Sequence, residues 1–326
     1  MHEFFAVCPP GLSSLCRREL TGLDAGIQNI QLVPGGVRFF CKPGDAFLAA
    51  LLLRSPSRIY MRIARFKADR FSVLEKKIQG IDWELFLPAG ADPAIQVTTR
   101  TSRLYHSEAV ADRCRPIIQA ALKTETPQNP DFQTLMVRAE NNWFDLSLDL
   151  SGTPLFKRGI KHRVAGAPLR ENLAFAVLDA AGFTPEDVLV DPMCGAGTFS
   201  IEGAMIQARI PPGFFRTFAF EAWPCFSAAG FGHAKSLAAR HFTSAGPVFA
   251  SDMDPEAVAA LKTNLAGRKF LTSVQACQQD FFDIVPDRLT PKKGVVVLNP
   301  PYGRRLGKNR DTTAFYRGIM EKLAAD

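Results

Sequence analysis

The sequence contains no apolar run that approaches the roughly 20 residues needed to span a bilayer. Its longest candidate, residues 46–53, is long enough for one amphipathic helix only. The N-terminus lacks a basic segment, an apolar stretch and a cleavage site, so we expect no export signal. These features predict a cytoplasmic protein without a membrane partner.

Close cysteine pairs are also missing. The seven cysteines are scattered, no two show the C-x-x-C spacing of a zinc ribbon or a redox motif, and their odd number argues against a disulfide framework. We therefore expect no metal site and interpret most cysteines as small core residues. Cys194 is the exception, because it falls in the glycine turn described below.

What the chain does contain is enough material for two domains. A length of 326 residues is long for one compact domain, and a hydrophobic content of 47% can fill real cores. The formal net charge is +7. This modest excess of basic residues suits a polyanionic partner, although charge alone does not identify one.

The first half of the sequence predicts a mixture of helices and strands. Apolar spacing and turn residues give strands near 4–7, 37–40, 58–65, 95–99, 134–139 and 143–150. Helices are expected near 12–20, 45–53, 73–78 and 107–122, with Asp45 as the cap of the second.

A basic stretch then interrupts this pattern. Lys157, Arg158, Lys161, His162 and Arg163 crowd together between two more periodic segments. We place the domain boundary here, with a first domain over 1–154, a linker over 155–167 and a second domain over 168–326.

The second half alternates helix and strand, which predicts an α/β fold with a parallel sheet. A helix is expected over about 170–181, and apolar strands end near Asp191, Ser251, Ala276 and Leu298. The uniformly apolar run 295–298 is typical of a strand in the middle of a sheet that is covered on both faces.

The first of these strands leads into Asp191-Pro192-Met193-Cys194-Gly195-Ala196-Gly197-Thr198, and a helix follows from Phe199. Two glycines allow close approach of a ligand to the backbone. A dinucleotide fingerprint would have a third glycine where Ser200 stands, and a phosphate-binding P-loop would have a lysine that is missing here. For this turn alone, a tight strand–helix connection is an equally good interpretation.

Three aspartates at consecutive strand ends favour a binding site. Asp191 can face a cationic amino acid moiety, Asp252 can accept from both ribose hydroxyls, and Asp280 can accept from an adenine amino group. Each of them alone is more often a cap or a turn residue. Asp254 is better explained as the cap of the helix that starts at Pro255.

About 55 residues separate Gly197 from Asp252, against the roughly 20 expected for a minimal βαβ unit. The excess contains Pro211-Pro212-Gly213-Phe214-Phe215 and further aromatic residues through Phe231. We interpret this segment as an insertion over the rim of the active site, with plain packing as an equal alternative.

The last strand delivers Asn299-Pro300-Pro301-Tyr302-Gly303 to a carboxyl end, where it should neighbour the glycine turn. The carboxamide oxygen of Asn299 and the carbonyl of Pro300 can accept both N–H bonds of a conjugated amino group and so aim its lone pair at a sulfonium methyl. The prolines stiffen the turn, and Tyr302 can stack on a base. Methylation at pyrimidine C5 would need a cysteine nucleophile, and none stands here.

These motifs resemble the class I methyltransferase signature, and specifically the THUMP-domain RNA guanine-N2 methyltransferases. The resemblance extends to Gly35-Gly36-Val37-Arg38-Phe39 and Ile81-Asp82-Trp83 in the first half, and to Lys157-Arg158-Gly159 and Ala167-Pro168-Leu169-Arg170-Glu171-Asn172 at the junction. It implies a ferredoxin-like and THUMP region over 1–154 and a Rossmann-like methyltransferase sheet over 168–326. S-adenosylmethionine is the implied cofactor.

The resemblance also implies roles for individual residues. Catalysis would be carried by Asn299, Pro300, Pro301 and Tyr302. The cofactor would be held by Asp191, Met193, Cys194, Gly195, Ala196, Gly197, Thr198, Asp252 and Asp280. Domains of this family continue beyond the Asn299 strand with further strands and helices, so we expect this chain to be a fragment or to have an incomplete sheet.

RNA contacts are expected from basic residues in three places. Those in the first domain surround a strand–helix junction, those in the linker adjoin the catalytic domain, and one follows the catalytic turn. The candidates are Arg100, Arg103, Lys157, Arg158, Lys161, Arg163 and Arg304. For any single residue of the first group, a solvated helix face is the simpler interpretation.

The resemblance is greatest to bacterial enzymes that form N2-methylguanosine in large-subunit ribosomal RNA. Three alternatives stay open: guanine-N2 methylation of tRNA, adenine-N6 methylation of RNA or DNA, and a non-catalytic RNA-binding factor. The sequence does not indicate an oligomeric state.

Overall fold

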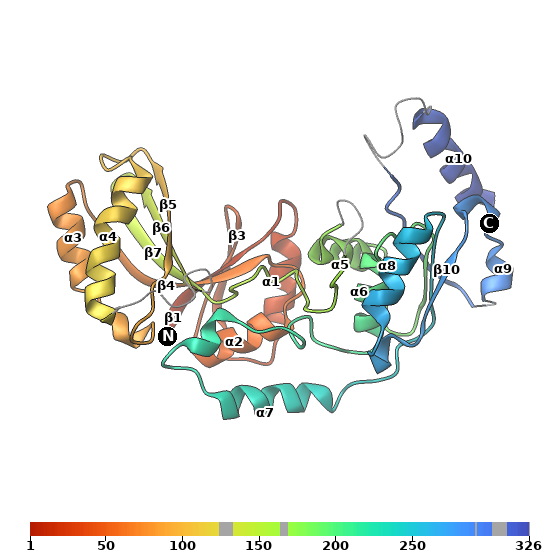
Figure 1. Cartoon of the computed structure of the whole chain (residues 1–326), viewed down its shortest axis with the longest axis horizontal. Helices are drawn as coiled ribbons and strands as arrows, with labels where there is room; N and C mark the ends of the chain where they lie inside the picture. Colours follow the sequence, from red (N-terminus) through yellow and green to blue (C-terminus); the bar gives the residue numbers. More distant parts are fainter. Residues whose placement is uncertain (124–132, 164–168, 291, 302–311, 326) are drawn as a thin grey trace. The chain divides into compact units, whose positions relative to one another are not determined.

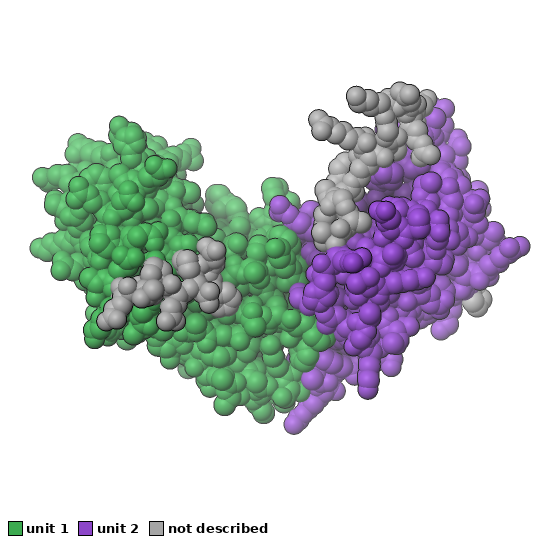
Figure 2. Space-filling model, viewed as in Figure 1, with its two compact units in different colours: residues 1–158, 212–237 green, residues 159–211, 238–326 purple. Residues whose placement is uncertain are grey.

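The computed structural model of the chain describes residues 1–123, 133–163, 169–290, 292–301 and 312–325. They fall into two units, coloured separately in Figure 2. The first unit consists of Met1–Arg158 and Pro212–Leu237, and the second of Gly159–Pro211 and Ala238–Asp326. The first unit therefore includes a segment from the second half of the sequence.

The first unit is built on one seven-stranded sheet with the order β2-β3-β1-β4-β7-β6-β5. All neighbouring strands are antiparallel except β5 and β6, which are parallel. The strands are β1 (His2–Val7), β2 (Gln28–Val33), β3 (Gly36–Cys41), β4 (Arg58–Lys67), β5 (Ala94–Arg100), β6 (Thr134–Glu140) and β7 (Trp143–Asp149).

Strand β4 joins the two halves of this sheet, because it pairs with β1 along one edge and with β7 along the other. The helices are α1 (Ser13–Thr21), α2 (Pro43–Leu52), α3 (Phe71–Gln79) and α4 (Ser107–Leu122), with the short 3-10 helix η1 (Trp83–Leu85). Figure 1 shows α3 and α4 lying side by side, and the two helices are in contact. One continuous apolar core runs beneath both halves.

The sequence reasoning located most of these elements but missed β2. That strand carries no fully buried side chain, so it lacks the apolar alternation by which its neighbours were found. It lies at the outer end of the sheet, where pairing with β3 on one side only holds it. Asp45 lies in the first turn of α2 and does not cap it, since the cap position is Lys42.

The aromatic-rich segment Pro212–Leu237 belongs to the core of the first unit. Phe220 stacks on Phe47 of α2 with ring centroids 4.2 Å apart, and Trp223 is 3% exposed. The indole Nε1 of Trp223 donates to Oε1 of Gln133 at 2.9 Å, and Gln133 Nε2 donates to the carbonyl of Ala219 at 2.8 Å. These contacts favour the second interpretation of the segment, that its aromatic residues serve for packing. They give no support to the first, an insertion over the rim of the active site. The segment also contains the 3-10 helix η2 (Ala219–Ala222) and most of α7 (Ala228–Ala239).

The second unit contains a four-stranded parallel sheet with the order β10-β9-β8-β11. Its strands are β8 (Val188–Asp191), β9 (Val248–Asp252), β10 (Val274–Gln278) and β11 (Gly294–Val296). Its helices are α5 (Glu171–Ala180), α6 (Thr198–Gln207), α8 (Pro255–Leu265), α9 (Pro286–Leu289) and α10 (Thr312–Ala325), with the 3-10 helices η3 (Lys269–Leu271) and η4 (Phe281–Asp283). The order of elements confirms the α/β fold.

The expectation of a central, covered position for the last strand is wrong for the described residues. There, β11 pairs with β8 alone, and Val296 is 47% exposed. The expected neighbour is confirmed, because Val295 and Val296 lie in register with Leu189 and Val190 of β8. No helix in the described part of the chain has both the length and the apolarity to cross a membrane.

Candidate active site

The turn between β8 and α6, predicted to bind a ligand, contains two glycines with a left-handed backbone. Gly195 and Gly197 both adopt left-handed conformations, with φ of 53° and 83°. A Cβ on Gly197 would lie 2.3 Å from Leu261 Cδ1 on α8, so a larger residue there would need that side chain to move as well as a strained backbone. A Cβ on Gly195 would meet nothing within 4 Å. Gly195 is therefore the position where open space allows a ligand to approach the backbone.

Asp191, at the end of β8, has a fully buried carboxylate. Its Oδ2 accepts from the backbone N–H of Ser200 at 3.1 Å and from the Ser200 hydroxyl at 2.6 Å. Its Oδ1 has no hydrogen-bond partner among the described residues. Burial raises the pKa of Asp191 to about 7, against the lowering effect of the bonds from Ser200. An orphaned carboxylate oxygen of this kind fits a cationic group of a ligand.

Ser200 is the partner that the sequence reasoning missed. It was noted only as the residue that stands where a dinucleotide fingerprint has its third glycine, yet its hydroxyl ties the start of α6 to the end of β8. A serine one turn into a helix that follows a strand-end aspartate was the available signal.

Asp252, at the end of β9, holds the glycine turn from the neighbouring strand. Its Oδ2 accepts from the Gly195 N–H at 2.8 Å, and its Oδ1 accepts from the Asp254 N–H at 3.0 Å. Each carboxylate oxygen has a second lone pair, and the residue is partly exposed. Asp252 can therefore accept further hydrogen bonds, as the proposed ribose contact requires.

Two further aspartates act as helix caps. Asp254 Oδ1 accepts from the Glu256 N–H at 2.9 Å, which confirms it as the cap of α8. Asp280 Oδ1 accepts from the Phe282 N–H at 3.0 Å and caps η4. Its Oδ2 is not part of this cap, so the predicted hydrogen bond from an adenine amino group stays a prediction.

Cys194 lies in the turn with 7% of its surface exposed. Burial, and then the charges of Asp191 and Asp252, raise the pKa of its thiol well above the ordinary value. The thiol therefore stays protonated and is a poor nucleophile. This agrees with the interpretation that Cys194 lines a pocket and does not attack a base.

The second turn follows β11 at the same edge of the sheet. Because β11 and β8 are parallel and adjacent, residues 297–301 and the turn 192–197 both leave carboxyl ends of neighbouring strands. The Val297 N–H donates to the Val190 carbonyl at 3.0 Å, which extends the pairing towards Asn299. The polar groups of Asn299 and Pro300 are partly exposed and bind no other described residue. Tyr302 and Arg304 lie outside the described residues.

Tyr316 on α10 contacts this second turn and was not predicted. Its hydroxyl donates to the Pro301 carbonyl at 3.2 Å, and its ring lies beside Phe315, which contacts Phe282. Residues 302–315 separate the two partners in sequence, so no local pattern could have indicated this bond.

Two of the predicted RNA contacts in the first unit, Arg100 and Arg103, are paired with acids. Arg100 lies 3.7 Å from a carboxylate oxygen of Glu140, and Arg103 lies 3.0 Å from one of Asp69. Such exposed pairs contribute little to stability and are readily exchanged. Lys157 and Arg163 are exposed as well. All four can therefore still contact RNA as predicted.

Two other basic residues of the predicted RNA-binding set, Arg158 and Lys161, have buried charged groups. Arg158 is 3% exposed and donates to the carbonyls of Leu155 and Arg54. The ammonium group of Lys161 donates to Thr198 Oγ1 at 2.9 Å and pairs with Glu171 at 2.8 Å. Both cations have protein partners that hold them away from solvent, so the structure gives no support to RNA contacts from these two residues.

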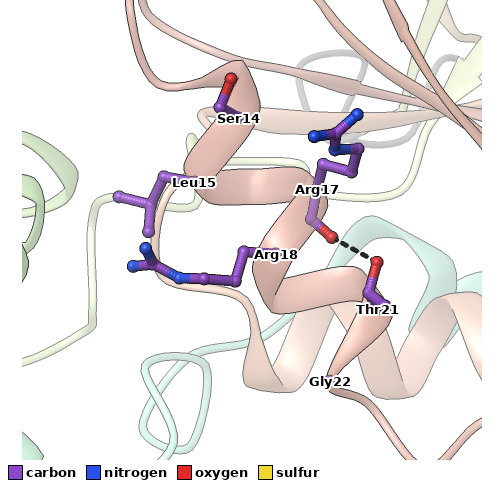
Figure 3. Close-up of a pocket in the computed structure, with 6 residues that line it drawn as sticks. All are labelled: Ser14, Leu15, Arg17, Arg18, Thr21 and Gly22. Carbon is purple, nitrogen blue, oxygen red and sulfur yellow. Dashed lines mark hydrogen bonds between the residues drawn. The ribbon is translucent and has the colours of Figure 1, made fainter.

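A surface hollow of about 700 Å³ lies on α1, and none of its lining residues was predicted as a site residue. In Figure 3, Leu15 and Arg18 extend from the same side of the helix, and Arg17 extends from another. Its lining consists of Ser14, Leu15, Arg17, Arg18, Thr21 and Gly22. Both arginines are exposed, which makes this a basic surface that the sequence reasoning did not single out.

Comparison with family models identifies both halves of the chain. The model described as RMKL-like, methyltransferase domain, matches residues 158–325, and the model of the RlmL ferredoxin-like domain matches residues 3–60.

Two curated relatives align over 98% of the chain. The putative RNA methyltransferase slr0064 of Synechocystis is 31% identical, and the alignment covers 84% of that protein. The ribosomal RNA large subunit methyltransferase K/L of Methylococcus capsulatus is 33% identical. The chain spans 45% of the length of this second relative.

Solved structures with the same fold cover 99% of the chain. The putative methyltransferase SMU.472, complexed with SAH, superposes with a TM-score of 0.86 at 27% identity over 86% of its own length. A predicted N6-adenine-specific DNA methylase of Listeria monocytogenes superposes with a TM-score of 0.83 at 26% identity, also over 86% of its length. With its glycine turn and its Asn299 turn at one edge of a parallel sheet, the chain belongs to the family of RMKL-like methyltransferase domains.

Proposed function

We propose that the chain transfers a methyl group from S-adenosylmethionine to the exocyclic N2 of a guanosine in RNA, and that large-subunit ribosomal RNA is the substrate. The observation that carries this proposal is the parallel pairing of β11 with β8. It brings two turns to one sheet edge, as a transfer between two bound molecules requires. The first has open backbone at Gly195, and in the second the polar groups of Asn299 and Pro300 bind no other described residue.

The residues of the first turn fit the cofactor. S-adenosylmethionine supplies a methyl group on a sulfonium, which a nucleophilic nitrogen takes up to leave S-adenosylhomocysteine. Oδ1 of Asp191 binds none of the described residues and can accept from a cationic amino group, and Asp252 has lone pairs left for hydroxyls. Gly195 leaves room against the backbone, and Met193, Cys194, Ala196 and Thr198 complete the lining.

The residues of the second turn suit an exocyclic amine. The lone pair of such a nitrogen is delocalised into the ring, so the nitrogen attacks only if its N–H bonds are held and the lone pair is turned outwards. The Asn299 carboxamide oxygen and the Pro300 carbonyl bind no other described residue and can accept these two bonds. The prolines restrict φ at 300 and 301. The two acceptors are therefore already held in place when the amine binds, which lowers the entropy cost of orienting it. The proton released as the N–C bond forms passes to water.

RNA as the substrate class is supported by the curated relatives. They are named as RNA methyltransferases, and several as ribosomal RNA large subunit methyltransferase K/L. The exposed arginines of the first unit provide suitable contacts, because their ion pairs with Glu140 and Asp69 can be exchanged for phosphates.

Adenine-N6 methylation is the second candidate, and one finding favours it. The Listeria structure carries the name of an N6-adenine-specific DNA methylase, and an amine-orienting turn serves adenine and guanine alike. We favour guanine because the sequence resembles the THUMP-domain guanine-N2 enzymes over nearly its whole length.

The test is methyl transfer from labelled S-adenosylmethionine to unmodified ribosomal RNA, with tRNA and duplex DNA as parallel substrates. Nucleoside mass spectrometry then identifies the product. We expect N2-methylguanosine from ribosomal RNA, and no transfer to the same RNA transcribed with inosine for guanosine, since inosine lacks the N2 amino group.

Other outcomes would redirect the proposal. N6-methyladenosine as the product, or full transfer to the inosine RNA, would replace guanine by adenine. If N2-methylguanosine formed in tRNA alone, tRNA would replace ribosomal RNA as the proposed substrate, and the proposed reaction would stay the same. An RNA that binds while calorimetry finds no binding of S-adenosylmethionine would indicate the non-catalytic RNA-binding factor.

A further inference from the structure

Lys161 lies on the segment that enters the second unit, and its ammonium group is enclosed by that unit. Its side chain is 8% exposed, and the side chain of its ion-pair partner Glu171 is 12% exposed. The ammonium also donates to Thr198 Oγ1 at 2.9 Å. The ammonium group that was expected to contact RNA thus binds two residues of the second unit.

The hydroxyl that receives this bond lies at the end of the glycine turn. Thr198 is the first residue of α6 and directly follows Gly197. Its Oγ1 also donates to the Leu169 carbonyl at 3.3 Å, so the hydroxyl serves as acceptor and donor together. Lys161 thereby fixes the point where the turn becomes helix.

A second, independent attachment joins the same segment to the same turn. Asn264 on α8 is 1% exposed. Its Oδ1 accepts from the N–H groups of His162 and Arg163 at 2.9 and 3.0 Å, and its Nδ2 donates to the Arg163 carbonyl at 2.9 Å. The same Nδ2 lies 3.4 Å from the carbonyl of Ala196, between the two glycines.

A turn of this kind needs outside support. Glycine residues in left-handed conformations impose little stiffness of their own, so contacts from elsewhere must define the shape of the turn. A buried ion pair is a poor source of stability, because an apolar pair of equal volume would serve as well or better. The better explanation for a lysine–glutamate pair here is that the lysine also orients Thr198.

We propose that Lys161 is a positioning residue for the S-adenosylmethionine site, and that residues 159–163 form a working part of that site. The proposal rests on the proposed function in so far as the turn 192–198 binds the cofactor. Lys161 acts through Thr198 and the turn and touches neither the cofactor nor the reacting atoms.

The test uses a double variant of the full chain, Lys161→Met with Glu171→Gln. Removing both charges avoids an unpaired buried carboxylate, which could unfold the protein and obscure the result. The matched control is Lys262→Met, which removes an exposed lysine from α8. Urea denaturation of all three proteins should give similar midpoints.

Two readouts follow the turn itself. Calorimetry should show the affinity for S-adenosylmethionine weakened by about 3- to 10-fold in the double variant, the loss expected for one orienting hydrogen bond, and unchanged in the control. Hydrogen exchange of the cofactor-free proteins should be faster by a similar factor at the amides of Gly195, Gly197 and Ser200. The kcat at saturating cofactor should stay near that of the wild type.

The two proposals fail in different ways. If the wild type binds S-adenosylmethionine and the double variant binds it equally well, Lys161 is not a positioning residue, whatever the exchange shows. If the wild type itself does not bind the cofactor, the proposed function fails, and the exchange measurement alone decides whether Lys161 holds the turn. Unchanged exchange would then overturn the positioning role as well.

Discussion

The two turns at the carboxyl edge of the second sheet are held in opposite ways. The turn 192–198 takes its shape from residues far away in sequence: Asp252 holds Gly195, Asn264 approaches Ala196, and Lys161 holds Thr198. The turn that begins at Asn299 takes its stiffness from its own prolines and has one described bond from outside, from Tyr316. One turn is shaped by the fold and the other mainly by its own covalent structure.

This difference separates binding from chemistry. Substitutions around the first turn should change cofactor affinity, because they alter the shape of a loop that has two glycines and many supports. Substitutions in the second turn should change the rate of transfer, because in the proposed function its polar groups orient the reacting nitrogen. Substitutions at Asn299, Asp191 and Tyr316 should separate the two effects, with the largest change at Asn299 and the smallest at Tyr316.

The largest effect is expected from Asn299→Ala. The substitution removes the side-chain oxygen that orients the amine, and loss of one preorganised polar group at a reacting centre lowers kcat by roughly 100-fold or more. The affinity for S-adenosylmethionine should not change, since Asn299 lies on the other turn. Single-turnover methyl transfer and calorimetry on the same preparation measure the two quantities.

Asn299→Asp is the matched comparison, because aspartate keeps an acceptor oxygen at the same position. It should retain clearly more activity than the alanine variant. An alanine variant that transfers methyl groups at the wild-type rate, or that loses cofactor affinity in step with its activity, would remove the distinction between the two turns.

The fold was largely predictable because its signals are local. Apolar alternation and glycine turns marked six of the seven strands of the first unit, and β2 escaped because its surroundings give it no buried face. The four parallel strands and the neighbouring places of β8 and β11 followed from apolar runs at helix–strand spacing. The place of Pro212–Leu237 in the first unit was not predictable, because Phe47 and Gln133 meet it only through the tertiary fold.

The candidate site was predictable in its motifs and not in its supports. Asp191, Gly195 and Asp252 meet at one edge because strand ends do so in any parallel sheet. The supports Asn264 and Tyr316 follow from no spacing rule, because they approach the turns only in the folded chain. Charge was the least reliable signal: Lys157 and Arg158 are adjacent in sequence, yet one is exposed and the other is buried. The sequence shows that a residue is charged, but not whether its side chain is exposed or buried in the folded protein.

A smaller effect, dependent on pH, is expected at Asp191. Burial raises the pKa of its carboxyl to about 7. A cationic group of the cofactor binds the ionised form better, so the affinity of the wild type for S-adenosylmethionine should rise as pH increases from about 6 to 8. Asp191→Asn should bind the cofactor about 10-fold more weakly at pH 8 and show no such rise. Calorimetry across this pH range measures both.

The same group should affect stability with the opposite trend. Between pH 4 and 7 the folded protein keeps a proton on Asp191 that the unfolded chain has lost, so the free energy of unfolding should fall over this interval, by roughly 4 kcal/mol at most. Urea titrations of Asp191→Asn at several pH values should show a free energy of unfolding that lacks this decrease. Asp254→Asn, which keeps the cap of α8, is the control and should follow the wild type in both measurements. A cofactor affinity that changes equally with pH in all three proteins would assign the titration to another group.

The smallest effect is expected from Tyr316→Phe. The change removes one neutral hydrogen bond, 3.2 Å long, from a side chain that is 37% exposed, and keeps the ring beside Phe315. Such a bond contributes about 0.5–1 kcal/mol, which corresponds to a loss of roughly 2- to 5-fold in kcat. Cofactor affinity should stay the same, because the bond supports the Asn299 turn alone. Leu323→Ala, at an exposed position on the same helix, is the control for general damage to α10. A loss of 100-fold in Tyr316→Phe would mean that the second turn, like the first, depends on the fold for its shape, because its prolines would then not suffice to hold Asn299 and Pro300 in place.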